Sequence, residues 1–231
     1  KTEFSYSLSD KYSNKLRGAE TVLINLSEEL SKIGHDVTVF NNCSSEYNIK
    51  NYCWLNIAKL TNNKYEFDVA VSNNDVRLLD LVESKKKIVI SHSIYTLEKF
   101  IRKKQLLSYL TNKPKFMLLG KYHEKMMTNL VSFFGTKIID YGIDEIFLKA
   151  NIKTSIGNNV AMFTSRQDRN LLKLIDIWKD KIFPKKKDIK LEITPLNDQN
   201  LSKFNIHDRE FSDQKNLVKN LLDARMVLIP G

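Results

Sequence analysis

The sequence predicts an α/β protein of two Rossmann-like units with parallel sheets, the second unit incomplete. Two observations carry this prediction. Short apolar runs alternate with longer stretches of helical periodicity, and a polar stretch between Gly142 and Asn159 interrupts the alternation once. Strands and helices that alternate along a chain form βαβ units with right-handed crossovers, and hence parallel sheets.

The predicted strands are apolar or β-branched throughout, as expected of strands that a parallel sheet buries on both faces. In the first unit they are Asp36–Phe40, Phe67–Ser72, Lys87–Ser91, Lys115–Leu119 and Thr136–Asp140. In the second unit they are Val160–Ser165, Ile189–Thr194 and Met226–Ile229. An earlier strand is only weakly indicated, because its alternation is limited to Phe4, Tyr6 and Leu8.

The clearest helix is predicted over Ala19–Ile33, where one stripe of leucine and isoleucine recurs at helical spacing and Gly34 provides the C-terminal stop. That stripe consists of Leu23, Leu26, Leu30 and Ile33. The other predicted helices are Val76–Val82, Leu97–Leu110, Tyr122–Phe133, Asn170–Phe183 and Asp213–Leu222.

The polar interruption divides the chain into a domain over 1–150 and a domain over 151–231. The second domain stops at the apolar stretch Met226–Gly231, and a strand without a following helix would leave its apolar face uncovered. We therefore expect the chain to be cut short at its C-terminus. Because it begins with Lys1 rather than Met, we expect a slight loss at the N-terminus too.

Composition excludes several classes of protein. Of the 231 residues, 42% are apolar and 10% aromatic, which excludes a disordered chain, and seven glycines with four prolines exclude collagen-like material. No apolar run approaches the roughly 18 residues of a membrane span, and the N-terminus has no signal-peptide core. Cys43 and Cys53 form neither a CxxC pair nor a cluster with histidine, so neither a disulfide scaffold nor a zinc site is indicated. We expect a cytoplasmic globular protein.

Ligands of such sheets bind at the carboxyl ends of strands, near helix N-termini. Gly18 stands at the start of the clearest helix, where a glycine lets the backbone approach a ligand, although a purely structural role is equally open. Glu20 is interpreted as a first-turn carboxylate that complements the helix dipole, with a ligand role as the alternative. The dinucleotide fingerprint GxGxxG is absent, which argues against NAD binding.

Four segments, in order, resemble motifs of the family 4 glycosyltransferases, which have the GT-B fold. Arg17-Gly18-Ala19-Glu20, followed by the helix and Gly34-His35-Asp36-Val37, is similar to the family's opening Gly-Gly-Ala-Glu loop, helix and Gly-His-Glu-Val. The later three are Tyr141–Phe147, which resembles the Asn-Gly-Val-Asp turn, Phe163–Trp178, which resembles the Gly-Arg…Lys-Gly segment, and Leu222–Gly231, which resembles the strand before the donor-sugar loop.

This resemblance implies transfer of a sugar from a UDP- or GDP-type nucleotide sugar to a glycan, lipid or protein acceptor. It also implies that the reaction retains the configuration of the sugar and needs neither a metal nor a cofactor. Arg166 and Arg169 would bind the donor diphosphate, where guanidinium groups stabilise the charge that develops on the leaving nucleotide. The substrate cleft would be lined by Gly18, Gly142, Ser165 and Gly231.

His92 follows the predicted strand Lys87–Ser91 directly, where the family often has a histidine at the sugar site. A histidine at a strand end can contact a sugar hydroxyl or stabilise charge near the anomeric carbon, so we take His92 as the catalytic candidate. From spacing alone, a loop histidine with only a structural role is equally open. His35, His123 and His207 lack this placement and are predicted to be surface residues.

Several departures from the family pattern bear on these roles. Arg17 replaces the first glycine of the pair, Ser165 replaces the glycine before the arginine, and Arg169 stands in the place of a lysine. The Glu-x7-Glu motif, whose carboxylates hold the donor sugar and ribose in the family, would lie beyond Gly231. We therefore expect the chain by itself to be inactive.

The formal net charge of +10 is unevenly distributed. Between Lys85 and Lys125 there are eleven lysines and arginines against only two acidic residues, Glu98 and Glu124. The amphipathic stretch Leu97–Leu110 lies within this region and could contact an anionic membrane surface, although it could equally cover the sheet. No nucleic-acid-binding motif is legible, so nucleic acid is not expected as a partner.

Three alternatives to a transferase stay open from the sequence. A GT-B sugar-nucleotide epimerase would share the fold and the phosphate site but would need no acceptor. A non-catalytic module that binds a sugar nucleotide or a membrane surface would release no nucleotide. A basic nucleic-acid binder would lose affinity steeply with salt.

Overall fold

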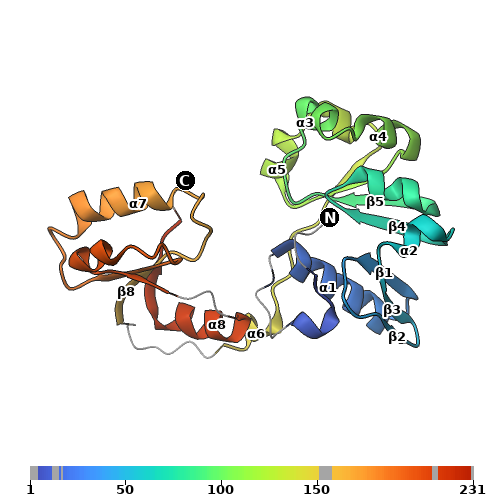
Figure 1. The fold of residues 1–231 in the computed structure, drawn as a ribbon. Coiled ribbons are helices and arrows are strands. Elements are labelled where there is room, and N and C mark those ends of the chain that lie inside the picture. The colour runs from blue at the N-terminus through green and yellow to red at the C-terminus, as the bar shows by residue number, and fades with distance from the viewer. Residues whose placement is uncertain (1–4, 12–15, 17, 151–157, 210–212, 230–231) are drawn as a thin grey trace. The chain divides into compact units, whose positions relative to one another are not determined.

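The computed structural model describes residues 5–11, 16, 18–150, 158–209 and 213–229, which form two units (Figure 1). Among the described residues, the first unit comprises 5–11, 16 and 18–142, and the second comprises 143–150, 158–209 and 213–229. The division at residue 150 drawn from the sequence stays a prediction. Gly231 lies outside the described residues.

A small sheet opens the first unit. Its strand order is β1-β3-β2, with β1 (Val37–Asn41) parallel to β3 (Tyr52–Asn56) and β2 (Tyr47–Ile49) antiparallel to β3. The sequence did not predict β2 and β3, because their residues are largely polar and aromatic. Lys50, in the left-handed region at φ 47°, turns the chain between them. This sheet is therefore mixed rather than wholly parallel.

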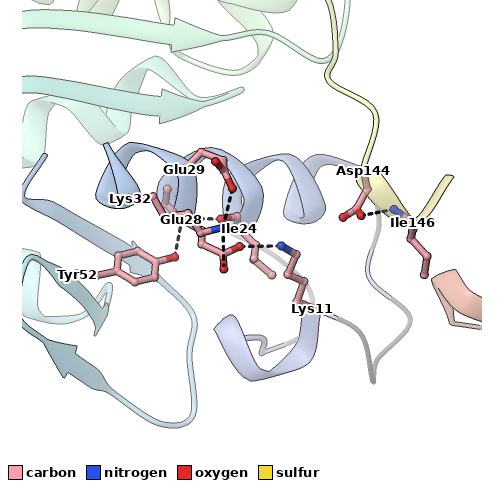
Figure 2. Close-up of polar contacts among 9 residues, drawn as sticks. Lys11, Ile24, Glu28, Glu29, Lys32, Tyr52, Asp144 and Ile146 are labelled. Atoms are coloured by element: carbon pink, nitrogen blue, oxygen red, sulfur yellow. Dashed lines mark hydrogen bonds and ion pairs between the residues drawn. The ribbon is translucent and has the colours of Figure 1, made fainter. Parts of the chain in front are cut away.

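Helix α1 (Gly18–Lys32) packs on this small sheet through Ile24, which is fully buried beside Trp54 and Tyr52. The Ser27 hydroxyl lies 2.8 Å from the Tyr52 hydroxyl, and Lys11 Nζ lies 2.7 Å from Glu28 Oε2 (Figure 2). The predicted apolar stripe is buried only in part. Leu23, Leu26 and Leu30 are only half-buried and Ile33 is 71% exposed, because the helix turns its Ile24 side toward the sheet.

The larger sheet of the first unit has the order β4-β5-β6-β7 and is parallel throughout. Its strands are β4 (Glu66–Asn73), β5 (Glu83–Ile90), β6 (Lys115–Leu118) and β7 (Thr136–Ile138). Its main core is aromatic, with Tyr95, Phe100, Tyr109 and Phe116 each fully buried. The predicted strands are confirmed here, although Val69 and Val71 of β4 are exposed, so one face of that strand is open.

The helices beside this sheet are shorter than predicted (Figure 1). The stretch Leu97–Leu110 divides into α3 (Leu97–Arg102) and α4 (Leu106–Asn112), because Lys104 adopts φ 53° and ends the first helix. The stretch Tyr122–Phe133 divides into α5 (Lys121–Met126) and the 3₁₀ helix η3 (Asn129–Ser132). The remaining short helices of the unit are η1 (Leu8–Lys11), α2 (Lys59–Asn62) and η2 (Val76–Leu81).

The weakly indicated N-terminal strand is not found among the described residues. Ser5–Ser7 have no regular structure and Leu8 begins η1, although Tyr6 is buried in the core of the small sheet. A groove of about 1410 Å³ runs between β1 and β4 and is lined by both strands and by α1. The half-buried leucines of α1 line this groove, which explains their partial exposure.

The second unit holds one parallel sheet in the order β10-β9-β8-β11. The strands are β8 (Asn158–Met162), β9 (Lys190–Ile193), β10 (Ile206–Asp208) and β11 (Ala224–Val227). The helices are α6 (Glu145–Leu148), α7 (Leu171–Ile177), the π-helical turn η4 (Trp178–Ile182), the 3₁₀ helix η5 (Gln199–Phe204) and α8 (Gln214–Asp223). Asp144 caps α6 by accepting a bond from the Ile146 amide, 3.0 Å away (Figure 2).

Trp178 anchors the core of the second unit. Its side chain is 1% exposed, and its indole Nε1–H donates to the Phe204 carbonyl at 3.0 Å. Burying a side chain of this kind stabilises a fold by roughly 1.5–3 kcal/mol. Among the described residues, no helix is both long enough and apolar enough to span a bilayer.

Candidate functional site

The candidate residues of the first unit lie beyond the carboxyl ends of its parallel strands. β5 ends at Ile90, and Ser91 and His92 follow at once, as the sequence predicted for His92. β4 ends beside them, and the next residue, Asn74, adopts the left-handed region at φ 60°. This arrangement places Asn74 and His92 at the same edge of the sheet.

His92 is held on two sides. Its backbone amide donates to Asn74 Oδ1 at 2.8 Å, and its ring Nδ1 is hydrogen-bonded to the Tyr141 hydroxyl. The rings of His92 and Tyr141 are also stacked, with centroids 5.8 Å apart and planes at 11°. The second ring nitrogen, Nε2, is buried and has no hydrogen-bond partner among the described residues.

The electrostatic surroundings of His92 favour the neutral ring. Burial lowers the pKa of His92 below its usual value, and the nearby His123 lowers it further. A neutral imidazole carries one donor and one acceptor nitrogen, so Nε2 can form one hydrogen bond to a ligand. The site therefore offers one oriented, uncharged polar atom.

The other three histidines were all expected to be surface residues. His35 is exposed as predicted. His123 is half-buried, and its Nδ1 accepts a bond from the Leu119 amide at 3.3 Å. His207 is half-buried and lies 3.0 Å from Asn205 Oδ1. These last two side chains are therefore only partly exposed, since His123 lies in α5 and His207 lies in β10.

The arginine candidates lie in the second unit, in the turn that links β8 to α7. Arg166 is 61% exposed and pairs with Asp168 at 2.8 Å. Arg169 is exposed, and its backbone amide donates to the Arg166 carbonyl at 3.0 Å, so one turn holds both residues. The Ser165 carbonyl accepts a bond from the Thr194 hydroxyl at 2.5 Å, which ties this turn to the end of β9.

The glycine candidates are not required by packing. Gly18 begins α1 and Gly142 ends the first unit, and a Cβ atom added at either position would meet nothing within 4 Å. Both are exposed, so each presents bare backbone to solvent. Gly18, Gly142 and His92 belong to the first unit, whereas Ser165, Arg166 and Arg169 belong to the second.

Two residues that position His92 were not singled out from the sequence as site residues. Tyr141 lies in the segment Tyr141–Phe147, whose sequence indicates a turn rather than a contact with His92. Asn74 has no sequence signal beyond its place after a predicted strand. In the part of the chain that the structure describes, no group of three or more His, Cys, Asp or Glu side chains could hold a metal ion.

Comparison with known proteins bears on the fold. No protein-family model matches the chain, and no curated protein matches it either. Among solved structures, the chain is similar to WaaG, described as a glycosyltransferase involved in lipopolysaccharide biosynthesis. The TM-score is 0.55 at 14% sequence identity, over 93% of this chain and 71% of that one. The chain therefore has a Rossmann-like α/β fold of the GT-B type.

Proposed function

We propose that this chain takes part in glycosyl transfer from a nucleotide sugar to an acceptor. The observation that carries the proposal is the position of Arg166 and Arg169 at the carboxyl end of β8, in a fold similar to that of a glycosyltransferase. In α/β sheets this edge is where ligands bind. Two exposed guanidinium groups held by one turn suit the two phosphates of a nucleoside diphosphate.

The reaction requires stabilisation of the negative charge that develops on the leaving diphosphate. The bond between the anomeric carbon and the diphosphate oxygen breaks, and the nucleoside diphosphate departs with both bonding electrons. A new bond forms between the anomeric carbon and an acceptor hydroxyl oxygen, and the hydroxyl proton passes to the departing phosphate oxygen. Arg169 and Arg166 would stabilise the negative charge on the departing phosphate. We extend the proposal to retention of configuration and to transfer without a metal, with UDP or GDP as the carrier.

On the acceptor side, His92 would contact the sugar through Nε2. Its lowered pKa keeps the ring neutral, so the contact would be a hydrogen bond rather than a charge pair. Because Nε2 is buried, the sugar would have to displace the side chains that cover it. We expect the cleft-lining backbone at Gly18, Gly142 and Ser165 to lie within reach of the substrates, and the protein to act in the cytoplasm.

Calorimetric titration with UDP and with GDP tests the donor site. We expect one of the two to bind, and Arg169→Ala to weaken binding about tenfold or more, since a hydrogen bond to a charged group contributes roughly 1.5–3 kcal/mol. Lys181→Ala is the matched control, because Lys181 is an exposed cation of the same unit outside the turn. Equal loss in both variants would mean general charge attraction and would refute a specific diphosphate site.

Incubation with radiolabelled UDP- and GDP-sugars separates the enzyme classes. Release of nucleotide that requires an acceptor supports a transferase, whereas conversion of the sugar without one supports an epimerase. Nucleotide binding with no turnover of any kind would instead support a non-catalytic binding module.

A second proposal concerns contact with an anionic membrane surface. Four apolar side chains of α3 and α4 are exposed, by 45–74%, and we call them the α3–α4 patch: Leu97, Ile101, Leu107 and Leu110. Arg102 ends α3, Lys103 and Lys104 follow it before α4, and all three are exposed. Apolar side chains that project among cations suit the interface of a bilayer with anionic headgroups.

Co-sedimentation with vesicles tests this contact. We expect binding to vesicles that contain phosphatidylserine, weaker binding to pure phosphatidylcholine, and loss of binding in Ile101→Ser/Leu107→Ser. Phe133→Ser is the control, since Phe133 is 74% exposed but belongs to neither helix. Undiminished binding of the patch variant would refute the proposal.

A further inference from the structure

The turn that carries the two arginines is a loop that precedes α7. It runs from Ser165 to Arg169, and α7 begins at Leu171. Within the turn, the Arg169 amide donates to the Arg166 carbonyl at 3.0 Å, and the Arg166 guanidinium pairs with Asp168 at 2.8 Å. An exposed ion pair contributes little to stability. The geometry of the turn therefore depends on its contacts with neighbouring elements.

Two side-chain hydrogen bonds join this turn to the loop that follows β9. The Thr194 hydroxyl donates to the Ser165 carbonyl at 2.5 Å, and Nε2 of Gln167 donates to the Pro195 carbonyl. Thr194 and Pro195 come directly after β9. The bonds attach both the start and the middle of the turn, so the arginines are held only as well as this loop is held.

Asp208 holds the loop after β9 from the next strand of the sheet. It is the last residue of β10. Its Oδ1 accepts from the Leu196 amide at 3.0 Å, and its Oδ2 accepts from the Asn197 amide at 2.8 Å. Hydrogen bonds to an ionised group are stronger than bonds between neutral groups. Both oxygens of one carboxylate are therefore used to fix one loop.

These bonds form a continuous path across the carboxyl ends of three adjacent strands, β10, β9 and β8. We call it the strand-end path, and it runs from Asp208 through the loop 195–197 to Gln167. All of its members belong to the second unit. A ligand that needs two guanidinium groups at set positions binds more tightly when their turn is already ordered, because less conformational freedom is lost on binding.

We propose that Asp208 and Gln167 are positioning residues of the diphosphate site, which order the turn of the two arginines without touching the nucleotide. The inference rests on the proposed function, and it deepens that function by assigning the support of the arginines to the ends of β9 and β10. The charge of Asp208 alone would oppose the binding of an anion. Its two bonds to the loop give a carboxylate at this edge a supporting role instead.

Calorimetric titration with UDP and GDP separates positioning from charge, because the two predict opposite signs. Asp208→Ala removes a negative charge, so charge alone would strengthen nucleotide binding. Loss of positioning should instead weaken it about fivefold, which is the effect of one ordinary hydrogen bond. Asp208→Asn keeps one acceptor oxygen and should bind more tightly than Asp208→Ala. Gln167→Met keeps the side-chain length without the donor and should also weaken binding about fivefold.

Asp180→Ala is the matched control, because Asp180 is an exposed carboxylate of η4, in the same unit but outside the strand-end path. It should bind the nucleotide at least as tightly as the parent chain does. Binding by Asp208→Ala that equals or exceeds that of the parent chain would overturn the proposal. Equal weakening in Asp180→Ala would overturn it too, since the loss would then have no connection with the path.

Amide order parameters measured by NMR test the positioning with no ligand present. In Asp208→Ala, the order parameter of the Arg169 amide, which donates to Arg166 rather than to Asp208, should fall from about 0.85 toward about 0.6. The Leu191 amide, which donates to the Asn205 carbonyl at 2.9 Å, should be unchanged. A merely structural carboxylate would loosen the whole unit, or only the two amides that it binds. Either result would overturn the proposal.

The two measurements keep this inference apart from the proposed function. If the parent chain binds neither UDP nor GDP but the Arg169 amide loosens in Asp208→Ala, the nucleotide site fails and the positioning of the turn stands. If the parent chain binds a nucleotide and the Arg169 amide stays ordered in both Asp208→Ala and Gln167→Met, the positioning fails. Because Gln167 is exposed, its variant gives this readout even where Asp208→Ala does not fold.

Discussion

The contact between His92 and Tyr141 can be measured as a coupling free energy. We choose Tyr141→Phe and His92→Phe because each removes the hydrogen bond yet keeps an aromatic ring in the stacked pair, whose centroids are 5.8 Å apart. The bond from the His92 amide to Asn74 involves the backbone and survives both changes. A double-mutant cycle therefore isolates the bond between the ring nitrogen and the hydroxyl.

The magnitude follows from the burial of the two partners. A neutral hydrogen bond contributes about 0.5–1.5 kcal/mol to stability, and Tyr141 is 48% exposed, which favours the lower end of that range. We expect Tyr141→Phe alone to lower the free energy of unfolding by about 0.5–1 kcal/mol. The coupling in the double variant should be about 0.5 kcal/mol.

The assay is urea unfolding followed by tryptophan fluorescence. The chain has two tryptophans, Trp54 in the first unit and Trp178 in the second, so a Trp178→Phe background reports the first unit alone. A coupling indistinguishable from zero would mean that the hydroxyl does not bind Nδ1. In that case the orientation of His92, and the role given to its Nε2, would lose their support.

Two further predictions use the same samples. The first unit should lose stability as the pH falls through about 6.5. The reason is that His92 becomes protonated in the unfolded chain but stays neutral in the folded chain, where its pKa is lowered. His92→Phe should flatten this decline, and an unchanged slope would contradict the lowered pKa. Trp178→Phe should destabilise the second unit by about 1–3 kcal/mol, because it removes the indole donor to the Phe204 carbonyl. Circular dichroism during urea unfolding measures this loss of stability. A change below about 0.5 kcal/mol would show that water replaces the indole as the donor.

The parallel strands were predictable because most contain a short apolar run, such as Val69–Val71 in β4 and Ile88–Ile90 in β5. β4, β5, β6 and β9 lie close to where periodicity placed them, and the polar stretch after Gly142 begins where the second unit begins. Such runs are a local signal, and burial on both faces leaves few alternatives. The fold class could therefore be predicted from one sequence.

The hairpin of β2 and β3 could not be predicted, because its residues alternate between polar and aromatic types without a clear apolar run. Helix lengths were overestimated for a different reason. Lys104 adopts the left-handed region at φ 53° and ends α3, although a lysine inside a helical pattern gives no strong stop signal.

The candidate site was predictable only in part. The place of His92 after β5 follows from strand periodicity, whereas its partners Asn74 and Tyr141 are far away in the sequence and meet it only in the folded unit.

Asn74 has a consequence for how this protein can change over evolution. Its left-handed backbone turns the chain after β4, and its side chain holds the amide of His92. Glycine is the usual residue for such a backbone and would relieve its strain, but it would release His92. Aspartate would keep an acceptor oxygen but add a charge beside a histidine kept neutral. Substitution of Asn74 is therefore limited both by the backbone conformation and by the bond to the His92 amide. A replacement that stabilises the backbone would lose the residue that positions His92.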